Sequence, residues 1–255
     1  MHIKFIFTFL PAFIYAVEFP LEFNGKVFLG KYLNSDTTRF NMDASAQLRC
    51  KMVEYKFLSF FMEYRDDLDM AEQKGGVSLD PRYSHYFVTG GFEYDLNKLY
   101  TQIVFIHDCV HDIDYEVEGT PVFNRIMLSL ANKNYHPSNQ ILTKQKFLWA
   151  FNLRFYPHWR YYGWDINAGA DYQYDFNFDG IYKFINQKNF GALLDINLLM
   201  CKSDTTFYHQ DFFRLATYYK NFNRSIGIEL KYNIYNNDPI KNPGGLWLLS
   251  AFVEF

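Results

Sequence analysis

Long apolar segments are scarce in this sequence, although 49% of its 255 residues are hydrophobic. After residue 16, no stretch holds the roughly 20 consecutive apolar residues that a helix needs to cross a bilayer. This absence excludes a helical membrane protein. The mean hydropathy of −0.23 indicates instead that apolar and polar residues share the same segments, as they do in alternating strands.

Cysteine is also scarce. Cys50, Cys109 and Cys201 are too few for a disulfide framework, and their odd number leaves at least one thiol unpaired in an exported protein. No Cys-x-x-Cys pair or other zinc-binding spacing occurs. Phosphate loops, dinucleotide fingerprints and Gly-x-Ser-x-Gly elbows are missing as well. We therefore expect no cofactor.

The sequence has no excess of basic residues and no composition typical of a linker. Its 25 basic residues face 28 acidic ones, for a net charge of −3, so no basic patch points to a nucleic-acid partner. No segment rich in Pro, Gly and Ser divides the chain. We therefore expect one domain.

Residues 1–16 have the layout of a secretory signal peptide. Lys4 supplies the charged head, residues 5–15 form the apolar region, and Ala16 is a small residue at the expected cleavage point. The apolar region is too short to span a bilayer as a helix. We expect residues 17–255 to form the mature domain.

Regular alternation of apolar and polar residues marks three windows, at 39–52, 165–179 and 225–234. In the first window the even positions from Phe40 to Met52 are apolar and the odd positions from Arg39 to Lys51 are polar. A period of two places these sets on opposite faces of a strand, whereas a helix would scatter the charges around its surface. These windows predict strands with one apolar and one polar face.

The last ten residues, 246–255, show the same pattern and end on an aromatic. Alternate positions form one apolar face, made of Trp247, Leu249, Ala251, Val253 and Phe255. This segment resembles the closing strand of bacterial outer-membrane β-barrels. The resemblance implies an all-β, antiparallel up-and-down transmembrane β-barrel in the outer membrane of a Gram-negative-type bacterium. It also implies outer-membrane lipids and the barrel assembly machinery as partners.

Composition and strand count agree with such a barrel. Aromatic residues make up 21% of the chain, and the two interfaces of a membrane barrel require aromatic girdles. Weaker strand candidates raise the count to about 12, with 10 as the alternative. They lie near 25–33, 55–65, 82–95, 98–109, 122–133, 145–156, 189–200 and 206–218. A soluble sandwich alternates too, but the length of the strands and their aromatic outer face count against it.

An even strand number places both termini and the short turns on the periplasmic side. The tight connections at 95–98 and 220–223 fall there, and the longer ones at 66–81, 109–121, 157–163 and 236–245 fall outside. The connection at 134–144 is longer than a periplasmic turn, and no feature of the sequence explains it.

One stretch carries side chains suited to chemistry. His107, Cys109 and His111 share a face at the outer end of one predicted strand, and Asn124 lies on the apolar face of the next strand. If both apolar faces point to lipid, His107, Cys109 and Asn124 project together toward the outer leaflet.

This arrangement resembles the outer-membrane phospholipase A and lipid A deacylase type of barrel. In those families a His-x-Ser pair, with Asn or Glu orienting the His from the next strand, attacks lipid esters on the outside of the barrel. The resemblance implies that His107 is the base, Cys109 the nucleophile and Asn124 the residue that orients the base. Cys109 departs from the Ser that those families use.

Two alternatives compete with a catalytic site. Polar residues gather at the outer end of a strand simply because the strand meets water there. A metal site built from His107, His111 and Asp112 is the other alternative, because alternate histidines on one strand can share an ion.

The polar face of the predicted strands is heavily charged. It includes Asp43, Arg49, Arg125, Arg154, Asp165, Asp171, Asp195, Glu229 and Lys231. Inside a barrel of about twelve strands such a face forms either a small pore or an interior filled with neutralising ion pairs. We therefore expect a structural barrel or small pore with a polar extracellular rim. The alternative is a lipid acyl-ester hydrolase that acts at the outer leaflet.

Overall fold

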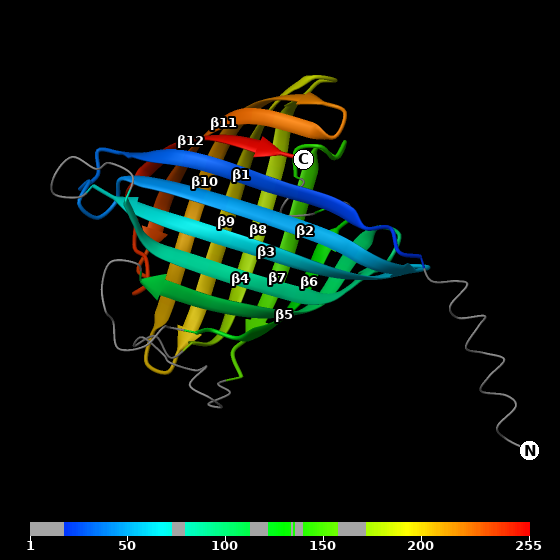
Figure 1. The fold of residues 1–255 in the computed structure, drawn as a ribbon, viewed down its shortest axis with the longest axis horizontal. Coiled ribbons are helices and arrows are strands. Elements are labelled where there is room, and N and C mark those ends of the chain that lie inside the picture. The colour runs from blue at the N-terminus through cyan, green and yellow to red at the C-terminus, as the bar shows by residue number, and fades with distance from the viewer. Residues whose placement is uncertain (1–17, 73–79, 113–121, 134, 136–139, 158–171) are drawn as a thin grey trace, which may run out of the picture.

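The computed structural model describes residues 18–72, 80–112, 122–133, 135, 140–157 and 172–255. In this part of the chain twelve antiparallel strands close into a single barrel (Figure 1). The strands are β1 (Glu22–Leu33), β2 (Met42–Tyr55), β3 (Leu58–Ala71), β4 (Asp80–Asp95), β5 (Leu99–Asp112), β6 (Arg125–Asn132), β7 (Phe147–Phe155), β8 (Tyr172–Asn186), β9 (Phe190–Ser203), β10 (Phe207–Asn221), β11 (Arg224–Asn236) and β12 (Trp247–Glu254).

The predicted all-β barrel of about 12 strands is confirmed. Each observed strand matches one predicted range, although the range 55–65, which matches β3, also includes Tyr55 of β2. Part of the 165–179 window, and all of the predicted signal peptide at 1–16, lie outside the described residues. Within the described part of the chain, no helix is long and apolar enough to cross a membrane.

Closure joins the first strand to the last. β1 and β12 pair antiparallel, from Lys26 opposite Glu254 to Leu33 opposite Trp247. Every other strand pairs with its neighbours in sequence. A closed ladder leaves no sheet edge, so the backbone N–H and C=O groups of the strands find partners without water, as a strand in lipid requires.

Apolar side chains cover the outside of the barrel. Ile103 is 59% exposed on β5, and Ile226 and Ile228 are each 58% exposed on β11. The inward faces carry the polar residues, as the alternation predicted. In the window 165–179 the alternation predicts Tyr172 and Tyr174 on the same apolar face. Tyr172 is an exception, because an irregularity in the β8–β9 register at Tyr172/Tyr174 leaves Tyr172 buried in the lumen while Tyr174 is 42% exposed.

The two ends of the barrel differ. We call the end that holds Glu22 and Glu254 the terminal end, and the opposite end the distal end. Four tight turns lie at the terminal end, and three of them contain a non-glycine residue at positive φ, namely Lys56, Asn97 and Phe222. The β6–β7 connection also lies at this end (Figure 1).

Candidate functional site

The β6–β7 connection packs into the terminal end of the lumen. We call its described residues, Tyr135 and 140–146, the plug. Tyr135 and Ile141 are 6% and 3% exposed and pack in one apolar cluster with residues of seven strands and with Phe28 of β1. The unusual length of this connection, unexplained by the sequence, therefore supplies side chains that occupy the inside of the barrel.

Side chains of the barrel wall satisfy the backbone of the plug. Lys183 Nζ donates to the carbonyl oxygens of Ile141 and Thr143, at 3.2 and 2.6 Å. The Glu254 carboxylate accepts from the amides of Gln140 and Ile141, at 2.6 and 3.0 Å. The plug has no regular secondary structure, so its buried polar groups depend on such side chains for hydrogen bonds.

Arg214 connects the plug to the charged wall. Its guanidinium donates to Asp195 Oδ2 at 2.9 Å, to Glu229 Oε2 at 2.9 Å and to Gln140 Oε1 of the plug at 2.8 Å. Glu229 also pairs with Lys26, at 3.2 Å. These charged side chains of the inner wall thus form ion pairs with one another.

The connection at 237–246 turns inward at the distal end. Lys241 Nζ lies 2.7 Å from Asp43 on β2 and 3.8 Å from Asp69 on β3. Asp238 accepts hydrogen bonds from Tyr172 and Gln210, at 2.8 and 2.7 Å. Burial lowers the pKa of the Lys241 ammonium, but the nearby carboxylates outweigh burial and hold that pKa above its usual range. The connection therefore stays ion-paired at neutral pH.

A cavity of 580 Å³ remains in the lumen, lined both by the plug and by the connection at 237–246. Asn152 donates to Asn177, and Asn177 donates to Asn197, each at 3.0 Å, along the wall of β7 to β9. On another wall the Arg49 guanidinium stacks on the Phe61 ring, 3.6 Å from its centroid. Most residues that line the cavity are polar or charged, and these contacts hold several of their side chains in place.

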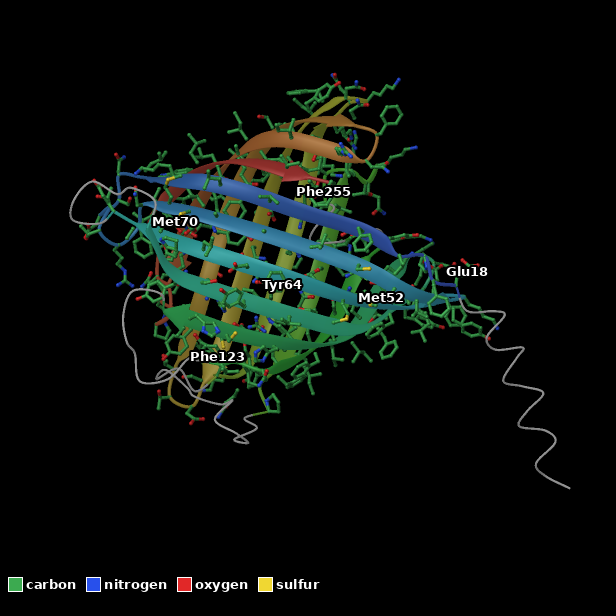
Figure 2. All side chains as sticks on the ribbon, viewed as in Figure 1. Glu18, Met52, Tyr64, Met70, Phe123 and Phe255 are labelled. Carbon is green, nitrogen blue, oxygen red and sulfur yellow. The ribbon has the colours of Figure 1, made fainter. Side chains whose placement is uncertain are left out.

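A second candidate site lies on the outside of the barrel. Polar side chains interrupt the apolar outer face of β3 to β6 near the distal end, and Figure 2 labels Tyr64 and Phe123 on this side of the barrel. We call this group of polar residues on the outer face the outer-wall patch. They are Asp66, Ser84, His107, Cys109, His111 and Asn124.

The structure pairs two of the three predicted catalytic residues, His107 and Asn124, and pairs the third, Cys109, with His111, which was predicted only as a metal ligand. His107 Nδ1 lies 2.7 Å from Asn124 Oδ1, so the ring nitrogen donates to the amide oxygen. Cys109 Sγ lies 3.4 Å from His111 Nε2. The imidazole that is hydrogen-bonded to the thiol is thus His111, and His107 is the imidazole bonded to Asn124. The catalytic roles of these residues stay predictions.

The alternative metal site also stays a prediction. His107 and His111 share the outer face of β5, but the Asp112 side chain lies outside the described residues. Among the described residues, no group of three or more His, Cys, Asp and Glu side chains is arranged to hold a metal ion.

Sequence reasoning missed two members of the outer-wall patch. Ser84 Oγ donates to Asp66 Oδ1 at 2.7 Å, and Ser84 is only 1% exposed. Ser84 stands directly opposite His111 in the β4–β5 register. Asp66 was predicted to begin a loop, but β3 continues to Ala71. A charged residue in line with Met62 and Tyr64 on the apolar period was the available signal.

No protein-family model and no curated protein matches the sequence. Solved structures do match. The outer membrane phospholipase dimer of Salmonella typhi, with bound calcium, gives a TM-score of 0.58 at 10% identity over 93% of this chain and 92% of that chain. The outer membrane phospholipase A of Escherichia coli gives 0.56 at 10% identity, over 93% and 97%.

Porins match at a similar level. The KdgM porin gives a TM-score of 0.53 at 9% identity, over 91% of this chain and 98% of that chain. Because both porins and phospholipases resemble the chain at such low identity, the comparison shows the fold and does not choose between their activities. The chain has the closed barrel fold of bacterial outer-membrane proteins, and its resemblance to the phospholipases is weak.

Proposed function

We propose that this chain is an integral protein of the bacterial outer membrane and that its barrel is a closed scaffold, not an open diffusion pore. The apolar outer wall and the fold of the solved relatives support the location. The terminal end would face the periplasm, and outer-membrane lipids and the barrel assembly machinery would be its partners.

The plug is the observation that carries this proposal. It occupies the terminal end of the lumen and bonds to three elements of the wall, through Lys183 on β8, Arg214 on β10 and Glu254 on β12. Hydrogen bonds that involve a charged group each contribute about 1.5–3 kcal/mol. Several of them acting together keep the plug seated and the passage shut.

The closed barrel should be electrically silent. Full-length protein extracted from the outer-membrane fraction and added to planar bilayers should give no stable conductance steps, because the plug blocks ion flow at the terminal end. A porin purified in the same detergent serves as the positive control. Stable ohmic channels from the wild-type protein would contradict the closed scaffold, and absence of the protein from the outer-membrane fraction would contradict the location.

A specific observation favours a second function, hydrolysis of lipid acyl esters. The 2.7 Å hydrogen bond between His107 and Asn124 orients an imidazole on the outer wall. His107 lies two residues before Cys109 on the same face of β5. A nucleophile beside an oriented imidazole is the arrangement that acyl transfer requires. The apolar wall below it, with Phe105 and Ile126, would hold an acyl chain next to the thiol.

Purified protein should therefore release fatty acid from phospholipid vesicles. Cys109→Ala should reduce the release by about 10²-fold or more, because the nucleophile is lost. Cys50→Ala is the matched control, since Cys50 is a free, half-buried thiol on β2 and lies outside the outer-wall patch. Equal release by wild type and Cys109→Ala would eliminate this function.

A further inference from the structure

Two imidazoles flank the Cys109 thiol, one on each side along β5. His107, Cys109 and His111 alternate on the outer face of the strand, opposite Val88, Tyr86 and Ser84 of β4. Single-base acyl transfer needs one imidazole next to the nucleophile. The second imidazole has no role in that scheme.

Neighbours on opposite sides of β5 hold the two imidazoles. Asn124, just before β6, binds Nδ1 of His107. Because that nitrogen is the donor, Nε2 of the neutral ring carries the lone pair. His111 leans toward β4, where its ring packs edge-on against Tyr86 with centroids 5.2 Å apart, and its Nε2 meets the thiol. The two rings are therefore positioned independently of each other.

Because the Cys109 thiol is buried, its reactivity depends on the group that accepts its proton. Cys109 is only 7% exposed, and low polarity disfavours a thiolate unless a cation forms beside it. His111 is the imidazole that can accept the thiol proton directly, across 3.4 Å.

We propose that the two histidines divide the reaction, with His111 as the base for Cys109 and His107 as the base for water; this division rests on the hydrolase function proposed above. In the first half, the thiol proton passes to His111 Nε2 while Sγ attacks the carbonyl carbon of the lipid ester. The ester C–O bond breaks, His111 gives the proton to the leaving alcohol oxygen, and an acyl thioester forms on Cys109.

In the second half, His107 Nε2 takes a proton from water, and the water oxygen attacks the thioester carbonyl. The C–S bond breaks, the fatty acid leaves, and the proton carried by His107 returns to the thiolate. Asn124 acts as a positioning residue, because its amide oxygen accepts from Nδ1–H and so leaves the basic lone pair of the ring on Nε2.

The test uses the full chain with Cys50→Ser and Cys201→Ser, so that Cys109 is the one remaining thiol. In the folded barrel, His111→Ala should slow alkylation of Cys109 by a small maleimide about tenfold, while His107→Ala should change the rate less than about twofold. After incubation with phosphatidylethanolamine vesicles, intact-protein mass should show an acyl adduct that persists in His107→Ala and is absent in His111→Ala. Resistance to unfolding in cold detergent shows that each variant is folded.

Each result decides a part of the proposal. Equal alkylation rates in wild type and His111→Ala overturn the thiol–His111 pairing. Absence of an adduct in His107→Ala overturns the assignment of water activation to His107. Alkylation that depends on His111, in a wild-type barrel that releases no fatty acid, refutes the hydrolase function and the second half of the scheme while the pairing stands. Asn124→Ala should behave like His107→Ala, and Asn124→Gln should restore part of the turnover.

Discussion

Lys183→Met should convert the closed barrel into a conducting one. Lys183 is fully buried, and its ammonium holds the plug through two backbone carbonyls, of Ile141 and Thr143. Loss of two charged hydrogen bonds lowers the free energy of opening by about 3 kcal/mol. That change raises the open population by on the order of 10²-fold, since about 1.4 kcal/mol corresponds to a factor of ten. Conductance steps in planar bilayers are the measurement.

A matched variant separates plug release from a general loss of positive charge. Lys51 also lies at the terminal end, but it pairs with Glu22 and Glu54, at 2.8 and 2.7 Å. Lys51→Met should leave the bilayer silent. Conductance in Lys51→Met equal to that in Lys183→Met would show that charge, and not the plug, closes the barrel. A silent Lys183→Met barrel would show that the plug is held by other contacts or is not the barrier.

The barrel could be predicted because its cause is local. Alternation such as that between Arg39 and Met52 predicts both the strand and the face that points inward. Twelve such strands can pair all of their backbone N–H and C=O groups in lipid by closing into a barrel. The residues at which strands end and turns begin could be predicted less well. The tight turns are set by single residues such as Lys56, Asn97 and Phe222, which adopt positive φ without being glycine, and composition alone does not mark such residues.

The outer-wall patch was predicted in part. The two-residue period placed His107 and Cys109 on one face, and parity placed Asn124 beside them, which is where the structure has them. The period cannot say toward which neighbour an imidazole turns. In the structure His111 meets Cys109 and packs against Tyr86 of β4, whereas His107 bonds to Asn124. These partners depend on which residues of the neighbouring strands lie opposite each histidine.

The plug could not be predicted, because it is a tertiary feature. Its length stood out, but its partners Lys183, Arg214 and Glu254 are about 40 to 114 residues away in sequence. Each of them is a polar residue at an inward-facing position of its strand, as are many other residues of the wall. Nothing local distinguishes a wall residue that binds a loop from one that binds another wall residue.

Arg214→Leu should be the most destabilising single change in the lumen. Arg214 is 8% exposed, and it joins Asp195 and Glu229 to Gln140 of the plug. Removing one partner of a buried ion pair costs about 3–5 kcal/mol, because the remaining carboxylate is left uncompensated. The Asp195 carboxylate is 3% exposed and cannot recover this loss by meeting water. The midpoint of urea unfolding in lipid vesicles should fall accordingly.

Arg65→Leu is the control for this prediction. Arg65 also lies on the inner wall, but its pair with Asp67, at 3.3 Å, leaves both side chains more than a third exposed, and such pairs contribute about 0–1 kcal/mol. Arg214→Lys should recover only part of the stability, because one ammonium cannot reach Asp195, Glu229 and Gln140 with the forked geometry of a guanidinium. Since Arg214 also holds Gln140, Arg214→Leu should produce conductance steps like those of Lys183→Met. Unfolding midpoints that are the same for Arg214→Leu and Arg65→Leu would show that the lumen tolerates an unpaired Asp195, and that the ion-paired wall does not stabilise the closed state.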